Sequence, residues 1–272
     1  MLNVLDLFSG IGGFSLGLEA TGKFKTIAFC ETDRFCQKVL QKHWKDIPIH
    51  EDIKKLDGTK IKADVVVGGF PCQSFSIAGK QKGKDDERYL WDEMFRVIKE
   101  VKPRWIIGEN VQNLINISNG QILQGIHNDL ESQGFEVQTF NISASSQGAW
   151  HKRSRIWIVA ANTECLGFSK RSKKSEKFEG EETSDKFNNS NQGSQFRATS
   201  NQMELSNTNI KKQQTWWETE SKLFGVPHGL SAKLDTNRND RIKALGNSIV
   251  PQIITEIGKA IMAAEHEFFY KR

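Results

Sequence analysis

The stretch "NVLDLFSGIGGFSLGLEA", residues 3–20, contains an apolar run, a group of glycines and a second apolar segment. Its apolar first part predicts a short buried strand, its glycines predict a tight turn, and the apolar spacing from Gly13 to Ala20 predicts a helix. A strand followed by a glycine turn and a helix lets a ligand approach the backbone at the start of the helix. If Gly10 and Gly12 are the first two glycines of the dinucleotide fingerprint GxGxxG, the third position is Ser15, so the fingerprint is absent. A cofactor loop and a plain packing turn are both compatible with the stretch.

The alternation of short apolar runs and amphipathic segments continues to about residue 160. Strands are predicted at 25–30, 63–69, 104–110, 135–142 and 155–160, and helices at 34–43, 89–101 and 121–133. Such alternation is typical of a parallel sheet with helices on both faces. We therefore expect an α/β fold with a doubly wound, mostly parallel sheet.

The composition changes abruptly after Ala161. The stretch 169–214 is rich in Lys, Glu, Ser, Asn and Gln and poor in aliphatic residues, so it cannot build a core. Apolar residues return in "TWWETESKLFGVPHGL" and then at helical spacing near the C-terminus. We expect an α/β domain over 1–162, a short irregular region over 163–239 and a C-terminal segment, 240–272, that returns to the first domain.

The loop "GGFPCQSFSIAGK", residues 68–80, places Cys72 directly after Pro71 and after the apolar run "ADVVV". A lone cysteine is more often a small buried hydrophobic residue than a nucleophile. This one follows a strand and lies among glycines and polar residues, where a buried hydrophobic residue is not expected. Pro71 also restricts the backbone beside the thiol, which suits a fixed nucleophile. We therefore favour a catalytic role for Cys72.

Charged residues stand at the ends of several predicted strands. Glu31 and Asp52 lie where an acid can bind ribose hydroxyls, although an acid at a strand end is usually just solvated. Glu109 ends a later strand, and Arg153 and Arg155 alternate as they enter the last one. At the same edge as the thiol, these groups would form a pocket for a planar polar ring. Taken singly, each is most simply a surface charge or a salt bridge.

The composition is typical of a cytoplasmic protein. The net charge of +5 suits a polyanionic partner without requiring one. The four cysteines form no CxxC pair and no cluster with the six histidines, so we expect reduced thiols and no metal site. No secretion signal and no run of about 18 apolar residues is present, so we expect a soluble protein without a membrane partner.

In their order, these motifs resemble those of the cytosine-carbon-5 DNA methyltransferase family of bacteria and phages. The matching pieces are "DLFSGIGGFSLGLE", "ETD", "ED", "GGFPCQSFS", "ENV", "HKRSRIWIV" and "ALGNSIVPQI". They cover roughly residues 1–162 and 240–265, and their combination is highly specific. The resemblance implies the sheet of S-adenosyl-methionine-dependent methyltransferases, with a small irregular target-recognition region between the two covered parts.

The resemblance also implies roles for individual residues. The consumed methyl donor, S-adenosyl-methionine, would be bound by Phe8, Ser9, Gly10, Gly12, Glu31, Asp52, Asn247 and Ser248. Cys72 would attack carbon 6 of a cytosine swung out of double-stranded DNA, and carbon 5 would then take the methyl group. Glu109 would hydrogen-bond the ring nitrogen and amino group, Arg155 would contact the ring carbonyl, and Arg153 would support the pocket.

Three departures from the family pattern bear on function. His151 stands where glutamine is usual, which we expect to be tolerated. Thr32 replaces a larger apolar residue beside the adenine, which would loosen donor binding. The interval 163–239 is short for a target-recognition domain. We therefore expect a minimal enzyme with reduced or unusual sequence specificity.

Other functions are compatible with the same scaffold. An RNA cytosine methyltransferase and a catalytically silent DNA-binding homologue are the alternatives, and intact Cys72 and Glu109 argue against the second. A nicotinamide dehydrogenase is disfavoured by Ser15 and by the cysteine loop. The expected partner is double-stranded DNA. In a restriction system, a cognate restriction endonuclease would be a second partner. The sequence indicates no particular oligomeric state.

Overall fold

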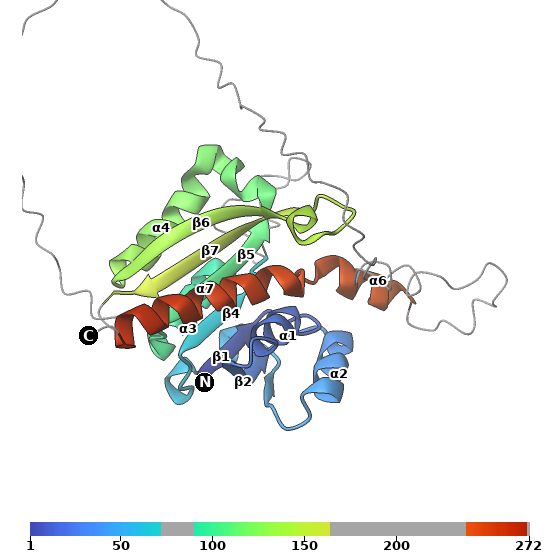
Figure 1. Cartoon of the computed structure of the whole chain (residues 1–272). Helices are drawn as coiled ribbons and strands as arrows, with labels where there is room; N and C mark the ends of the chain where they lie inside the picture. Colours follow the sequence, from blue (N-terminus) through green and yellow to red (C-terminus); the bar gives the residue numbers. More distant parts are fainter. Residues whose placement is uncertain (72–89, 164–237, 271–272) are drawn as a thin grey trace, which may run out of the picture.

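The computed structural model describes residues 1–71, 90–163 and 238–270. These residues form one seven-stranded sheet with helices on both faces (Figure 1). The strand order is β3-β2-β1-β4-β5-β7-β6. The α/β prediction is confirmed. The expected irregular region lies almost wholly outside the described residues, so the three-part division of the chain stays a prediction.

Six of the seven strands of this sheet run in one direction. The bounds are β1 Leu2–Leu7, β2 Phe24–Cys30, β3 Ile49–His50, β4 Val65–Gly68, β5 Trp105–Val111, β6 Phe135–Ser143 and β7 Ser154–Asn162. The neighbours from β3 to β5 pair in parallel, whereas β7 pairs antiparallel with both β5 and β6. The sheet is therefore mostly parallel, as predicted, and β7 begins at the edge where the other strands end.

Helices cover the sheet in two layers. The bounds are α1 Gly13–Glu19, α2 Arg34–His43, α3 Trp91–Val101, α4 Gln121–Ser132, α6 Arg238–Asn247 and α7 Pro251–Tyr270. Residues of α1 and α7 belong to one hydrophobic core and residues of α3 and α4 to the other, which puts the pairs on opposite faces. Among these described segments, no helix is long and apolar enough to cross a membrane.

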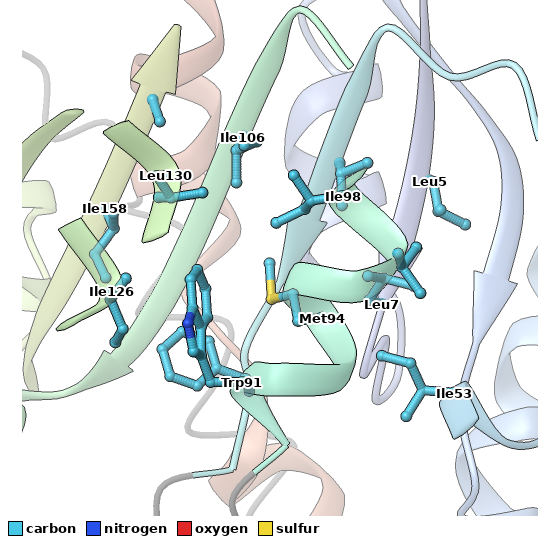
Figure 2. Packing of buried hydrophobic residues seen from close by; sticks show 14 of the residues in the cluster. Leu5, Leu7, Ile53, Trp91, Met94, Ile98, Ile106, Ile126, Leu130 and Ile158 are labelled. Atoms are coloured by element: carbon cyan, nitrogen blue, oxygen red, sulfur yellow. The ribbon is translucent and has the colours of Figure 1, made fainter. Parts of the chain in front are cut away.

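The central strands supply side chains to both cores. In β4, Val66 packs with α3 and α4, whereas Val65 and Val67 pack with α1 and α7. This continuous apolar run is what a strand covered on both faces requires. Figure 2 shows Trp91 and Met94 of α3 within the first of these cores, among buried residues from the strands and α4.

Helix α7, from the end of the chain, packs closely on α1 near its beginning. A Cβ atom on Gly17 would lie 2.2 Å from Cγ2 of Ile254 and 2.4 Å from the carbonyl oxygen of Pro251. The Thr255 hydroxyl donates to the Gly17 carbonyl at 2.8 Å. Farther along α7, the buried Glu265 accepts a hydrogen bond from the Trp105 indole at 2.7 Å. The last helix is thus fixed to both the first helix and the sheet.

Candidate active site

A cavity of about 670 Å³ lies at the carboxyl edge of the parallel strands. Its walls come from the segments that follow β1, β2, β3 and β4, from the end of β5, from the start of β7 and from α6. Ligands of doubly wound sheets bind in the crevice outside the strand ends where the strand order reverses, here between β1 and β4. Eight of the residues expected from the sequence line it: Phe8, Gly10, Glu31, Asp52, Glu109, Arg153, Arg155 and Asn247.

Four expected site residues are not among the lining residues. Cys72 lies outside the described residues. Ser9 is buried and donates its hydroxyl to the Asp6 carbonyl at 2.6 Å. A Cβ atom on Gly12 would lie 2.6 Å from the Trp44 ring, so the absence of a side chain at this residue serves packing. The Ser248 hydroxyl points back toward its own neighbour, donating to the Ile249 carbonyl at 3.2 Å.

The turn after β1 is held by Glu31 at the end of β2. Gly10 has a φ of +54°, and a Cβ atom added to it would meet nothing within 4 Å, so its backbone is open to the cavity. Its N–H donates to Glu31 Oε2 at 2.7 Å, and the Asp33 N–H donates to Glu31 Oε1 at 2.7 Å. Each oxygen has a second lone pair for a ligand. The sequence left open whether this turn is a cofactor loop or a packing turn. The open backbone of Gly10 fits a cofactor loop, whereas the close packing of Gly12 on Trp44 fits a packing turn.

Phe8 and Asp52 complete this end of the cavity. Phe8 is a non-glycine residue with a φ of 52°, a conformation that costs free energy and is often found at functional sites. Its ring packs against the core on the α3 side. Asp52 caps the short helix that follows β3, accepting from the Lys54 N–H at 2.9 Å. An aromatic ring and two carboxylates therefore gather around the glycine turn.

The opposite wall is built at the end of β4. Phe70 is buried, with its ring centroid 5.2 Å from that of Trp91 on α3. Its carbonyl accepts from the Asn110 side-chain amide at 2.9 Å. Pro71 lines the cavity and directly precedes Cys72 in the sequence. The last described residues before the cysteine are thus fixed by contacts with α3 and β5.

Glu109 and Arg155 form an ion pair inside the cavity. Arg155 Nε lies 3.1 Å from Glu109 Oε1, and Glu109 is 9% exposed. Burial raises the pKa of Glu109 to about 7, against the opposing effect of Arg155 and, more weakly, of Arg153. A carboxyl group with such a pKa can donate a proton or a hydrogen bond near neutral pH, which an ordinary surface glutamate cannot.

Arg153 ties the start of β7 to the C-terminal end of α6 and to the residue that follows it. It has a φ of 32°, and its Nη2 donates to the carbonyls of Gly246 and Ser248 at 2.8 and 2.7 Å. Burial lowers the pKa of its guanidinium, and the neighbouring charge of Arg155 acts in the same direction. The sequence suggested that Arg153 supports the pocket without indicating these two partners.

Helix α6 has a second attachment, at the start of α2. Lys243 Nζ lies 3.0 Å from Asp33 Oδ2, and this contact is the largest cause of the lowered pKa of Asp33. Asp33 also caps α2 by accepting from the N–H groups of Phe35 and Cys36. Sequence reasoning missed both roles of Asp33. An aspartate directly before a helix is a usual cap signal, whereas the pair with Lys243 has no local signal.

The described cysteines lack the properties of nucleophiles. Cys30 and Cys36 are buried, and burial raises the pKa of each thiol to about 12, with a further contribution from Glu31. Such thiols stay protonated near neutral pH. The described ranges also contain no group of three or more His, Cys, Asp or Glu side chains that could hold a metal ion.

Sequence reasoning also missed a buried carboxyl group beneath the glycine turn. Asp6 of β1 is fully buried, its Oδ2 accepts from the Ser15 hydroxyl at 2.7 Å, and its Oδ1 has no hydrogen-bond partner. Burial raises the pKa of Asp6 to about 8. The signal in the sequence was Asp6 itself, a single acidic residue within an apolar strand. A carboxyl group is seldom buried in such a strand unless it is protonated or paired.

Comparison with known proteins points to one family. The model of the family described as C-5 cytosine-specific DNA methylase matches residues 2–235. The Type II methyltransferase M1.ScrFI of Lactococcus lactis subsp. cremoris is 43% identical over 158 residues, which are 57% of this chain and 40% of that protein. M.HhaI of Haemophilus parahaemolyticus is 33% identical over 159 residues, 58% of this chain and 48% of that protein. The chain thus spans about half the length of the curated relatives it matches.

Solved structures show the same fold. A protein described as a DNA modification methyltransferase encoded within an Escherichia coli prophage has a TM-score of 0.51 and 26% identity, over 61% of this chain and 48% of that one. DNMT2 of Spodoptera frugiperda has a TM-score of 0.51 and 21% identity, over 60% of this chain and 50% of that one. At this lower identity, the likeness to DNMT2 concerns the fold alone.

Proposed function

The chain belongs to the C-5 cytosine-specific DNA methylase family, and we propose that it transfers a methyl group from S-adenosyl-methionine to carbon 5 of cytosine in double-stranded DNA. The observation that carries the proposal is the convergence of two chemical environments on one cavity. Glu31 and the open Gly10 backbone lie at one end, and the buried Glu109–Arg155 pair lies at the other.

The donor end suits an adenosine-containing ligand. Glu31 is oriented by two backbone N–H groups, which leaves lone pairs for ribose hydroxyls. Phe8 offers an aromatic ring, and Asp52 offers a second carboxylate. When bound, S-adenosyl-methionine would supply an electrophilic methyl group. The chain's part at this end is to hold the donor so that this group faces the base.

The base end suits a planar pyrimidine that is a poor electrophile. Cys72, directly after the cavity-lining Pro71, is the proposed nucleophile, whose thiolate forms a bond to carbon 6. Glu109, whose pKa is about 7, gives its proton to the ring nitrogen. This neutralises the negative charge that the attack places on the ring. With the donor bound, the methyl group would pass to carbon 5 and S-adenosyl-homocysteine would be released. Carbon 5 then gives its proton to water, the thiolate leaves carbon 6, and the ring nitrogen returns its proton to Glu109.

A base within a duplex cannot reach this cavity, so the target cytosine must leave the stack. The proposed partner is therefore duplex DNA that can be opened at one base. The Type II names of the relatives suggest a cognate restriction endonuclease as a second partner. The expected cytoplasmic location and the unusual sequence specificity stay predictions.

The test is transfer of a tritiated methyl group from S-adenosyl-methionine to unmethylated duplex DNA by the wild type and by Cys72→Ala. We expect label on carbon 5 of cytosine with the wild type and none with the variant. Donor binding, measured by calorimetry, should be similar in both, because Cys72 acts on the base. Label in the variant would overturn the assignment of the nucleophile.

Transfer RNA serves as the alternative acceptor in the same assay. Preferential labelling of transfer RNA would favour an RNA methyltransferase on this scaffold. A folded wild type that binds the donor and labels neither acceptor would favour the catalytically silent homologue. Bisulfite sequencing of a labelled plasmid would test specificity, since one long and strictly modified motif would contradict the expectation of reduced specificity.

A further inference from the structure

The loop between β6 and β7 presents a tryptophan to solvent. Trp150 is 82% exposed, whereas its neighbour Ala149 is buried in the core that α1 and α7 cover. An indole is a large apolar surface, so leaving it in water forfeits free energy that burial would provide. A single exposed apolar residue needs no explanation by itself. Trp150 stands out because it lies three residues before Arg153, which lines the proposed active site.

The backbone on both sides of Trp150 is fixed by hydrogen bonds. The Ala144 N–H donates to the Lys152 carbonyl at 2.8 Å, and the Ala149 N–H donates to the Ala144 carbonyl at 3.3 Å. The Ser143 hydroxyl also donates to the Lys152 carbonyl, at 2.7 Å. These bonds fix the backbone that carries the ring, so a contact made by the ring requires little further ordering of the loop.

Trp150 stands close to the cavity along the chain. Arg153, which lines the cavity, follows after three residues, a span of at most about 11 Å. Figure 1 shows the loop between β6 and β7 at the same end of the sheet as the junction of α6 and α7. The bonds from Arg153 to Gly246 and Ser248 agree with this placement. The loop that carries Trp150 therefore lies at the end of the sheet where the cavity is found.

We propose that Trp150 stacks on a nucleotide base next to the target cytosine when the protein binds DNA. The inference rests on the proposed function, because it takes the occupant of the cavity to be a base extruded from a nucleic acid. Aromatic side chains are common stacking surfaces for unpaired or partly unstacked bases, whatever their sequence. Opening a duplex at one base leaves its neighbours with a free face, which the indole would cover.

The charges around Trp150 favour a nucleic acid over an apolar protein surface. Lys152 is exposed and lies two residues away, between His151 and Arg153. A cationic side chain so close to an exposed indole suits a partner with both phosphates and aromatic bases. An apolar protein partner would instead leave the ammonium group poorly solvated. The proposal therefore assigns the indole to a base and Lys152 to the adjacent backbone phosphates.

The experiment compares Trp150→Ala, Trp150→Leu and Trp150→Phe in the full-length protein. Binding to fluorescein-labelled duplexes about three helical turns long, each with one mismatched cytosine that leaves the stack easily, is measured by anisotropy at several salt concentrations. We expect Trp150→Ala and Trp150→Leu to bind about tenfold more weakly and Trp150→Phe to stay within about threefold of the wild type. Because stacking releases no counterions, the slope of log affinity against log salt should be unchanged in all three.

Two further variants are matched controls. Phe140→Ala removes another exposed aromatic ring, which lines a separate hollow between β6 and α7, and should leave affinity unchanged. Lys152→Ala should weaken binding and also reduce the salt slope. Melting temperature and donor affinity should be the same for Trp150→Ala as for the wild type, since the indole is exposed.

The outcomes separate this inference from the proposed function. If the wild type binds DNA and Trp150→Ala binds equally well, the inference is wrong and the function is untouched. If Trp150→Leu keeps full affinity, the contact is merely apolar and stacking is excluded. A wild type that neither binds DNA nor labels it would overturn the proposed function and this inference together.

Discussion

Arg155 Nε lies 3.1 Å from Glu109 Oε1, and the Glu109 carboxyl group still has a pKa raised to about 7. Burial and the ion pair act on this carboxyl group in opposite directions, and burial prevails. The result is a group that is partly protonated near neutral pH while lying beside a fixed positive charge. That combination suits a residue that must hydrogen-bond a ring nitrogen as charge develops on it.

The first prediction concerns the pH dependence of methyl transfer. If protonated Glu109 is the active form, kcat/KM should fall about tenfold per pH unit above about 7. Glu109→Gln should lower kcat by about 100-fold or more and remove this decline, since an amide has no proton to transfer at these pH values. The profile is measured with tritiated donor on both sides of neutral pH.

Arg155→Gln provides the control for this assignment. Because Arg155 lowers the pKa of Glu109, its removal should move the decline in kcat/KM to higher pH, even as overall activity falls. A decline that stays at the same pH in Arg155→Gln, or that persists in Glu109→Gln, would assign it to another group.

The second prediction concerns Arg153 as a positioning residue. Arg153→Ala removes both hydrogen bonds to the carbonyls of Gly246 and Ser248, so the chain that leads from α6 to α7 loses its attachment to β7. We expect the dissociation constant of the donor to rise about tenfold, because Asn247 lies between these carbonyls and lines the cavity. Calorimetric titration with S-adenosyl-methionine measures the change.

Lys243→Ala is the comparison for this variant. It removes the exposed pair with Asp33 and shortens a side chain that also lines the cavity. Exposed pairs contribute little, so donor affinity should change by less than about threefold. Equal losses of donor affinity in the two variants would mean that both attachments hold α6 together. Unchanged donor affinity in Arg153→Ala would show that donor binding does not depend on the bonds from Arg153.

The sheet could be predicted from sequence because its central strands contain continuous apolar runs separated by turn signals. The triple valine of β4 and the strand at Trp105 are examples. Only the short β3, Ile49–His50, carries too few residues for a pattern, although its end was inferred from Asp52. Six strands in one direction also bring their final residues to one edge, so the grouping of Glu31 with Glu109 followed from topology.

The partners of the site residues could not be predicted in the same way. Arg153 contacts Gly246 and Ser248, which are 93 and 95 positions away, and Lys243 contacts Asp33 across 210 positions. Local spacing contains no information about such pairs, which depend on how α6 crosses the edge of the sheet. The glycine turn shows the same limit, since only packing against Trp44 distinguishes Gly12 from Gly10.

The third prediction concerns the neutral carboxyl group of Asp6. Its folded-state pKa of about 8 lies above the ordinary value of 3.8, so folding at neutral pH takes up a proton, and stability falls as pH rises from about 4 to about 8. Asp6→Asn mimics the protonated form and avoids this loss. The variant should match the wild type near pH 4 and exceed it by a few kcal/mol slightly above pH 8.

Thermal unfolding of both proteins at the two pH values measures this difference. Because Glu31 is the neighbouring charge that also raises the pKa of Asp6, Glu31→Gln should reduce the gain without abolishing it. An Asp6→Asn advantage that is the same at both pH values would mean that the Asp6 carboxyl group is not protonated in the folded protein.

The fourth prediction concerns the contact between α1 and α7. In Gly17→Ala, the added methyl group would meet the carbonyl oxygen of Pro251 at 2.4 Å, and this backbone atom cannot move without shifting α7. We expect a loss of about 1–3 kcal/mol, seen as a melting temperature lower by roughly 5 °C. Gly125→Ala is the matched control in α4, where nothing lies within 4 Å, and should stabilise by up to about 1 kcal/mol. If both variants gain stability, α7 does not pack on α1 as the structure has it, and the return of the C-terminal helix to the sheet would have to be abandoned.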